Sequence, residues 1–221
     1  MLALLTTLGI AENLQAQDWA ALEHFKEANK SVAPASEGEN RVVFMGNSIT
    51  IGWLNSRPEF FAGKPYINRG ISGQTTPQML LRFRQDVIDL EPKVVVILAG
   101  TNDIAGNTGP MTLQQILDNM QSMTELAEQN DIKVVLSSVL PAFDYPWRPG
   151  LKPNEKIPAL NEMIKTYAKQ NGHVYLDYFS AMADERNGLP KKYANDEVHP
   201  TVEGYKVMEP MVEAAIEKAL K

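Results

Sequence analysis

The sequence predicts a three-layer α/β/α sandwich in which a five-stranded parallel sheet lies between two layers of helices. Short runs rich in β-branched residues alternate with segments of helical periodicity, as in folds built from parallel strands and crossover helices. The length of 221 residues suits one hydrophobic core. Hydrophobic residues make up 44% of the chain and charged residues 22%, which is typical of a globular protein.

Five short runs are the predicted strands. Most of their residues are apolar, as expected of strands buried on both faces of a parallel sheet. They comprise residues 41–45, 65–68, 93–98, 132–137 and 173–176. Apolar residues recur at helical spacing in the other segments, and the predicted helices cover residues 19–29, 75–90, 112–130, 154–170 and 201–220. Right-handed crossovers then place helices on both faces of the sheet.

The first seventeen residues differ in composition from the rest. Residues 1–10 form an uncharged apolar run, and the small residue Ala16 suits the end of a secretory signal. We expect residues 1–17 to be a signal-peptide remnant and residues 18–221 to form a single domain, secreted or periplasmic. The alternative is a frayed first helix of the mature domain. The run is shorter than the roughly 20 apolar residues that span a bilayer, so stable membrane insertion is not expected.

Charge and cysteine content exclude several classes of function. The net charge is −6, whereas proteins that bind nucleic acid or anionic membranes carry dense patches of Lys and Arg. We therefore expect no nucleic-acid partner. Cysteine is absent, which removes disulfides, thiolate metal sites and cysteine nucleophiles. The oligomeric state is not predicted by any of these features.

Polar residues gather where the predicted strands end. Ligands of open α/β sheets bind outside the carboxyl ends of the strands, so the residues that follow each strand are candidates for a site. Three strand exits and one polar loop near the C-terminus carry chemically useful groups. They are Ser48, Gly73, Asn102, and Asp196 with His199.

Ser48 and the pair formed by Asp196 and His199 suit nucleophilic catalysis. Ser48 stands at the start of a helical turn, where main-chain N–H groups favour negative charge, although a lone serine there is usually a helix cap. A serine needs a base, and His199 is the histidine in a polar loop. Asp196, three residues earlier, can orient it. Alone, the Asp-x-x-His-Pro sequence is also a reasonable helix entry.

Gly73 and Asn102 suit the stabilisation of a negatively charged oxygen. Ester hydrolysis requires donors aimed at the oxygen that becomes negative, and these come from main-chain N–H groups and amide side chains. Gly73 lets a main-chain N–H approach a substrate closely. Each of the two residues alone is more often a turn residue.

Together these motifs resemble the four sequence blocks of the SGNH (GDSL-like) hydrolase family. The blocks carry Ser, Gly, Asn and His in this chain order, and the resemblance extends from residue 42 to about residue 204. It implies a flavodoxin-like α/β fold and a serine esterase with a triad of Ser48, Asp196 and His199. It also implies an oxyanion hole made by the N–H groups of Ser48 and Gly73 and the side chain of Asn102.

The resemblance favours one branch of the family and implies no cofactor. The Asn-Arg-Gly-Ile-Ser-Gly and Gly-Thr-Asn-Asp sequences look most like bacterial acetylesterases and platelet-activating-factor acetylhydrolases. A short-chain acyl ester of a carbohydrate or lipid, either a small molecule or a polysaccharide, is the expected substrate. Acyl transfer by this triad needs no cofactor, and no persuasive cluster of metal ligands is present, so neither is expected.

Two features leave alternatives open. Asn47 stands where the family has Asp, which removes a negative charge beside the nucleophile. One alternative is therefore that the protein is a non-catalytic, carbohydrate-binding relative of these enzymes. A flavodoxin-like module that binds a flavin is a further alternative, but it gives Asn102 and His199 no role. In the proline-rich segment 141–153, exposed rings of Tyr145 and Trp147 would be candidates for a substrate pocket.

Overall fold

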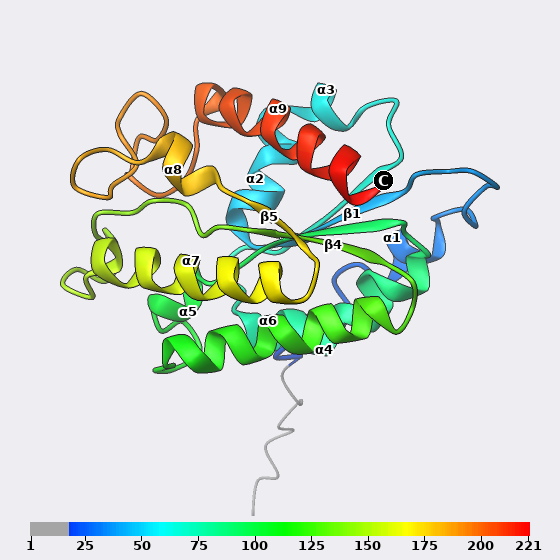
Figure 1. Cartoon of the computed structure of the whole chain (residues 1–221), viewed down its shortest axis with the longest axis horizontal. Helices are drawn as coiled ribbons and strands as arrows, with labels where there is room; N and C mark the ends of the chain where they lie inside the picture. Colours follow the sequence, from blue (N-terminus) through cyan, green and yellow to red (C-terminus); the bar gives the residue numbers. More distant parts are fainter. Residues whose placement is uncertain (1–17) are drawn as a thin grey trace, which may run out of the picture.

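The predicted parallel sheet is confirmed in the computed structural model, which describes residues 18–221 (Figure 1). Its five strands have the order β2-β1-β3-β4-β5 and are parallel throughout. The strands are β1 (Val42–Gly46), β2 (Tyr66–Gly70), β3 (Val94–Leu98), β4 (Lys133–Ser137) and β5 (Val174–Leu176). The expected signal segment, residues 1–17, lies outside the described residues.

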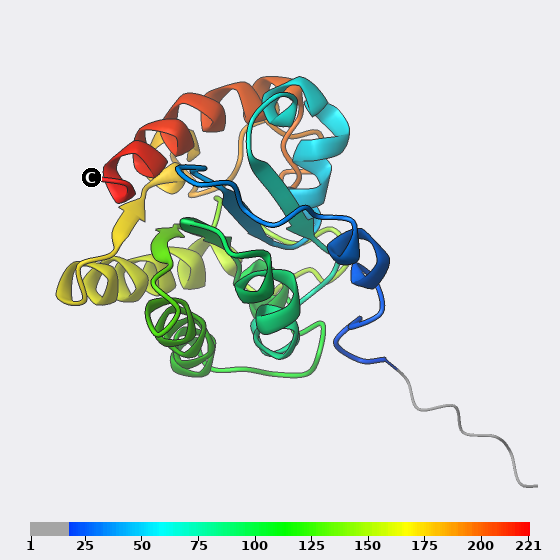
Figure 2. The ribbon, with the colours of Figure 1, turned by 90° about the vertical axis from the view of Figure 1, so that its right-hand side faces the viewer.

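Helices cover both faces of the sheet, which gives the three predicted layers (Figures 1 and 2). One face packs against α4 (Thr76–Asp86), α6 (Leu113–Glu128) and α7 (Pro153–Gln170). The other packs against α2 (Ser48–Ser56), α3 (Pro58–Phe61), α8 (Tyr178–Met182) and α9 (Val202–Ala219). Alternate residues of the strands point into the two cores: Val43 and Met45 toward α4, Val42 and Phe44 toward α2.

The first predicted helix is mostly wrong. Of residues 19–29, only the last part is helical, in α1 (Lys26–Lys30). Ala21 has a left-handed backbone with φ of 57°, and Asp18 accepts hydrogen bonds from the N–H groups of Leu22 and Glu23. This capped turn interrupts the helix. Leu22, which fits the apolar repeat, is 40% exposed.

The remaining predicted helices are present with small shifts at their ends. The segment 75–90 is divided into α4 and a short 3₁₀-helix, η1 (Ile88–Leu90). The short helix α5 (Thr101–Ile104), like α3 and α8, lies outside the predicted helices because four or five residues show no period. Across residues 18–221 no helix is both long and apolar enough to cross a membrane.

Candidate active site

Ser48 is the first residue of α2, directly after the turn that leaves β1. Asn47 caps this helix: its side-chain oxygen accepts a hydrogen bond from the main-chain N of Ile49 at 3.0 Å. The cap is therefore Asn47, and the hydroxyl of Ser48 is not used for it. Asn47 thus makes the local hydrogen bond expected of a capping side chain in the place where the family has Asp.

Two glycines allow α2 to begin close to the sheet. A Cβ atom on Gly46 would lie 2.0 Å from Thr50 Oγ1, and one on Gly70 would lie 2.4 Å from the main-chain N of Ile51. Gly46 and Gly70 are paired at the ends of β1 and β2. Any larger residue at either position would push the first turn of α2, and Ser48 with it, away from the strand ends.

The structure brings Ser48, His199 and Asp196 into one chain of hydrogen bonds. Ser48 Oγ lies 2.9 Å from His199 Nε2, and His199 Nδ1 lies 2.6 Å from Asp196 Oδ2. The carboxylate is an acceptor, so the imidazole proton belongs on Nδ1 and Nε2 is left to accept from the serine. This is the geometry that a base needs to remove the serine proton.

Asp196 is fixed by its own loop. Its Oδ1 accepts hydrogen bonds from the main-chain N of Val198 at 3.0 Å and of His199 at 2.7 Å. Partial burial raises the pKa of Asp196, but the hydrogen bonds from His199 and Val198 outweigh it and leave the pKa below the ordinary aspartate value. The carboxylate therefore stays ionised beside the imidazole.

Helix α9 holds the histidine loop against the serine. The helix begins three residues after His199, and the hydroxyl of Tyr205 in its first turn donates to the main-chain oxygen of Ile49 at 2.8 Å. At the other end of the loop, the N–H of Thr201 donates to the oxygen of Tyr193 at 2.6 Å. The first contact holds α9 against α2, and the second closes the loop that carries His199, so His199 is held beside Ser48 although the two are far apart in the sequence.

Asn102 lies in the turn that leaves β3, within α5. Its Nδ2 donates to the main-chain oxygen of Gln74 at 2.9 Å, and its side chain is buried. An amide nitrogen carries two hydrogens, so this contact fixes the orientation of the amide and leaves the second N–H for a ligand. Gln74 directly follows Gly73, so the same contact joins the Asn102 turn to the Gly73 loop.

Gly73 adopts a left-handed backbone, with φ of +78°, that L-residues seldom adopt. Its carbonyl accepts a hydrogen bond from Asn107 Nδ2 at 3.0 Å. A Cβ atom there would meet nothing closer than 3.9 Å, so the backbone angle rather than lack of space requires glycine. Asp103 ties the same loop to the β3 turn, since its Oδ1 accepts from the N–H and the hydroxyl of Thr76.

The segment 141–153 presents one aromatic ring to solvent beside His199. Trp147 is 44% exposed, and its ring centroid lies 6.1 Å from that of His199. Tyr145 is fully buried beneath it, stacked at 5.2 Å, with its hydroxyl hydrogen-bonded to Thr101. Of the two candidate pocket residues, Trp147 is therefore the one that a ligand can reach. A hollow of about 300 Å³ borders Asp196 on this side.

Two residues that build this site carry no signal in the sequence. The main-chain oxygen of Gln74 accepts from the Asn102 side chain, and the hydroxyl of Tyr205 donates to the main-chain oxygen of Ile49 in α2. A pattern of residue types does not show such main-chain partners. Only the fold reveals which carbonyl lies within reach of which side chain.

A family model for GDSL-like lipases and acylhydrolases matches residues 44–207. The chain belongs to this family. The matched residues run from before Ser48 to beyond His199. The membership confirms the family that the four sequence blocks indicate, and it supports the expectation that this GDSL-like chain is an ester hydrolase.

Two solved Bacteroides structures are similar to this GDSL-like chain over most of its length. A protein of Bacteroides fragilis NCTC 9343 that is assigned as an acylhydrolase is 47% identical, with a TM-score of 0.91, and the match covers 93% of this chain and 100% of that one. A GDSL-like lipase of Bacteroides thetaiotaomicron VPI-5482 is 49% identical, with a TM-score of 0.88, and the match covers 90% of this chain and 98% of that one.

Acetylxylan esterases of Xylanibacter ruminicola and Geobacillus stearothermophilus are among the curated relatives. The esterase of Xylanibacter ruminicola is 27% identical over 224 residues, which cover 85% of this chain and 45% of the esterase. The chain thus spans less than half the length of the first curated relatives that it matches.

Proposed function

We propose that this protein is a serine esterase that hydrolyses short-chain acyl esters, acetyl esters of carbohydrates above all, through an acyl-enzyme. The observation that carries the proposal is the chain of hydrogen bonds from Ser48 through His199 to Asp196. Support for an acetylated carbohydrate comes from the acetylxylan esterase relative and from the exposed ring of Trp147 beside His199.

In the first half of the reaction, Ser48 attacks the acyl carbon. Ser48 Oγ forms the new bond while His199 Nε2 takes the hydroxyl proton, and Asp196 stabilises the resulting imidazolium. The carbonyl oxygen becomes negative and is held by the N–H groups of Ser48 and Gly73 and by the second amide N–H of Asn102. The C–O bond to the alcohol then breaks, and the alcohol leaves with the proton from His199.

In the second half, water replaces the alcohol. His199 takes a proton from the water as its oxygen attacks the acyl-enzyme, and a second negative oxygen forms in the same hole. The bond to Ser48 breaks, the serine recovers its proton from His199, and a carboxylic acid leaves. His199 relays one proton from Ser48 to the alcohol and one from water back to Ser48, and the second water proton leaves with the acid.

A substrate screen tests this proposal. Rates measured on p-nitrophenyl esters of increasing chain length and on acetylated xylan should be highest for acetyl esters. A protein that binds acetylated xylan but hydrolyses none of these esters would be a non-catalytic carbohydrate-binding relative. Bound yellow colour after purification would indicate the flavin-binding alternative.

The pH dependence of turnover should show one rising limb. A neutral imidazole is needed to accept the serine proton, so kcat on p-nitrophenyl acetate should increase between about pH 5 and pH 8, where histidine side chains titrate. Asp196 adds no step in that range because its pKa is lowered. A profile that is flat from pH 5 to pH 8 would exclude a histidine base.

Replacement of Trp147 by alanine should weaken the binding of carbohydrate esters selectively. The exposed indole offers an apolar face to a sugar ring, whereas p-nitrophenyl acetate carries no sugar. We expect KM for acetylated xylo-oligosaccharides to rise about tenfold, the equivalent of roughly 1.4 kcal/mol, while kcat on p-nitrophenyl acetate stays unchanged. Equal effects on both substrates would show that Trp147 serves the histidine loop and not the sugar.

We also propose a location outside the cytoplasm. The support is the apolar run of residues 1–10 with Ala16 behind it. N-terminal sequencing of the protein recovered from fractionated cells checks this, and a cytoplasmic product with an intact Met1 would contradict it.

A further inference from the structure

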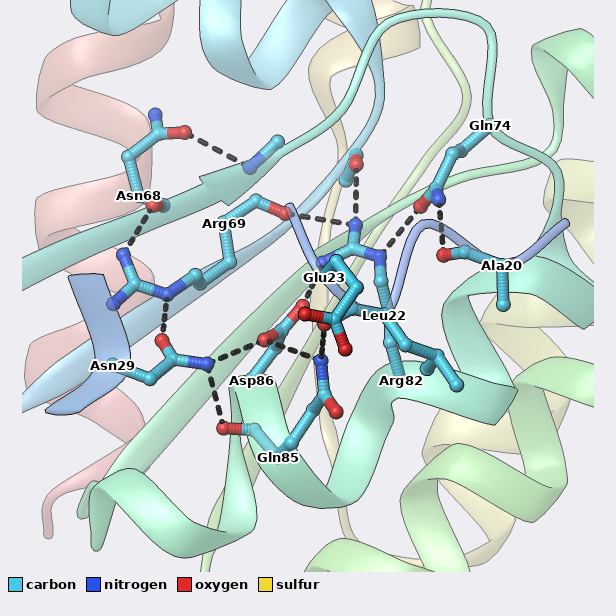
Figure 3. Close-up of polar contacts among 12 residues, drawn as sticks. Ala20, Leu22, Glu23, Asn29, Asn68, Arg69, Gln74, Arg82, Gln85 and Asp86 are labelled. Carbon is cyan, nitrogen blue, oxygen red and sulfur yellow. Dashed lines mark hydrogen bonds and ion pairs between the residues drawn. The ribbon is translucent and has the colours of Figure 1, made fainter. Parts of the chain in front are cut away.

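A buried arginine binds the strand ends from which two loops of the site emerge. Arg82, in α4, is 0% exposed, and its guanidinium donates four hydrogen bonds (Figure 3). Its Nη2 donates to the main-chain oxygen of Gly46 at 3.2 Å and to that of Arg69 at 2.9 Å. Gly46 stands two residues before Ser48, and Arg69 four residues before Gly73. One side chain therefore ties together the loops that carry two of the proposed oxyanion donors.

Gln74 connects Arg82 to the third loop. Its side-chain Oε1 accepts from Arg82 Nε at 2.5 Å, while its main-chain oxygen accepts from Asn102 Nδ2 at 2.9 Å. Gln74 is buried. A continuous path of hydrogen bonds thus runs from Arg82 through Gln74 to the side chain that would supply the third donor.

The positive charge of the Arg82 guanidinium is neutralised by a carboxylate of the same helix, and the group is shielded from water. Its Nη1 donates to Asp86 Oδ2 at 2.9 Å, one turn along α4, and both side chains are fully buried. The ring of Phe25 lies over the guanidinium groups of Arg69 and Arg82, at 4.7 and 6.0 Å. Because a guanidinium is planar with donors in fixed directions, it holds its acceptors at a defined spacing, which a lysine cannot do.

The N-terminal part of the described chain covers this network and offers a matched control. Three glutamines donate from their side chains to its main-chain oxygen atoms. These bonds join Gln74 to Ala20 at 2.8 Å, Gln78 to Trp19 at 2.6 Å and Gln85 to Leu22 at 2.6 Å. Of the three, Gln74 is the one whose contacts also include Arg82 and Asn102.

We propose that Arg82 and Gln74 are positioning residues of the oxyanion hole. They hold the loops of Ser48, Gly73 and Asn102 at the spacing that the negative oxygen of the tetrahedral intermediate requires. This inference rests on the proposed esterase function. The physical reason is that an oxyanion hole stabilises charge only when its donors are already in place. A displacement of about 1 Å can lower a rate by roughly 10²-fold.

Gln74→Met tests the inference without changing any of the three donors of the proposed oxyanion hole. The new side chain has a similar size, and the main-chain oxygen that binds Asn102 remains, but both side-chain hydrogen bonds are lost. We expect kcat on p-nitrophenyl acetate to fall about 10- to 100-fold and KM to change less than about twofold. Gln85→Met is the control: it loses the bond to Leu22 of the same N-terminal segment and a long one, at 3.4 Å, to Asp86 Oδ1, whereas Arg82 donates to Asp86 Oδ2. It should lower Tm with kcat unchanged.

A transition-state mimic gives a second readout that a purely structural role would not move. Phenylboronic acid adds reversibly to the serine oxygen and forms a negative tetrahedral boronate. Its affinity for Gln74→Met should fall in parallel with kcat, and Arg82→Lys should show the same parallel loss if it folds. Unchanged kcat and boronate affinity in Gln74→Met, with Tm alone lowered, would overturn the inference. A wild-type protein without esterase activity would instead overturn the proposed function, and this inference with it.

Discussion

Replacing Ser48 with alanine is expected to abolish ester hydrolysis, a loss in kcat of about 10⁶-fold, with almost no change in Tm. The hydroxyl supplies the oxygen that attacks the acyl carbon, and no other group takes its place. Its contact in the structure is the hydrogen bond to His199 Nε2, while Asn47 caps α2. We therefore expect the free energy of unfolding to change by about 0.5 kcal/mol or less.

Asn47→Ala is the matched control for that variant. It removes the acceptor for the N–H of Ile49 and should lower stability by about 1 kcal/mol, yet it leaves the nucleophile in place. Turnover of p-nitrophenyl acetate and thermal unfolding, measured on both variants, separate chemistry from folding. Substantial turnover by Ser48→Ala would show that another residue is the nucleophile.

Replacing Asn102 with alanine should lower kcat by about 10²- to 10³-fold, the usual effect of removing one oxyanion donor. KM should change little, because the donor meets a full negative charge in the transition state and only a neutral carbonyl in the bound ester. The structure supports this separation. One hydrogen of Asn102 Nδ2 is bound by Gln74, so the other is held in a fixed direction before the substrate arrives.

The neighbouring residue provides the control. In Asp103→Asn, the side-chain oxygen can still accept from Thr76, and the new amide nitrogen takes the place of Asp103 Oδ2, a buried atom with no hydrogen-bond partner among the described residues. Burial raises the pKa of Asp103, so loss of its charge should not reduce stability. We expect kcat close to wild type, with Tm lowered because the buried amide nitrogen finds no acceptor. An Asn102→Ala variant with unchanged kcat and lowered Tm would make Asn102 a turn residue.

β1 and β3 were predictable because each is buried on both faces and reads as a continuous apolar run. β2 carries Asn68 and Arg69 and is only partly buried at its start, and the predicted strand 65–68 ends two residues before β2 does. The longer helices were predictable from their 3.6-residue period. Residues 19–29 show where this reasoning fails, since Leu22 and Phe25 keep helical spacing while Ala21 turns the chain left-handed. The sequence carries no mark of that turn, which depends on the side chain of Asp18 folding back onto the main chain.

The candidate site was predictable to the extent that it follows from strand ends. Ser48 and Asn102 follow the carboxyl ends of β1 and β3, which are parallel neighbours, so the topology alone places both residues at the same end of the sheet. The pairing of Ser48 with His199 was predicted from the family resemblance, because the spacing of the two residues in the sequence does not indicate it. Arg82 and Gln74 were not predictable, because their partners are main-chain carbonyls and a buried arginine looks like any other charged residue of a helix.

The attachment of α9 has a consequence for how the protein folds. Ser48 and His199 are 151 residues apart, and the bond from Tyr205 to Ile49 joins the last helix to the first turn of α2 across 156 residues. Contacts of such separation form late, since a long loop must close before they stabilise the chain. During refolding, the return of activity therefore reports the docking of the last helix.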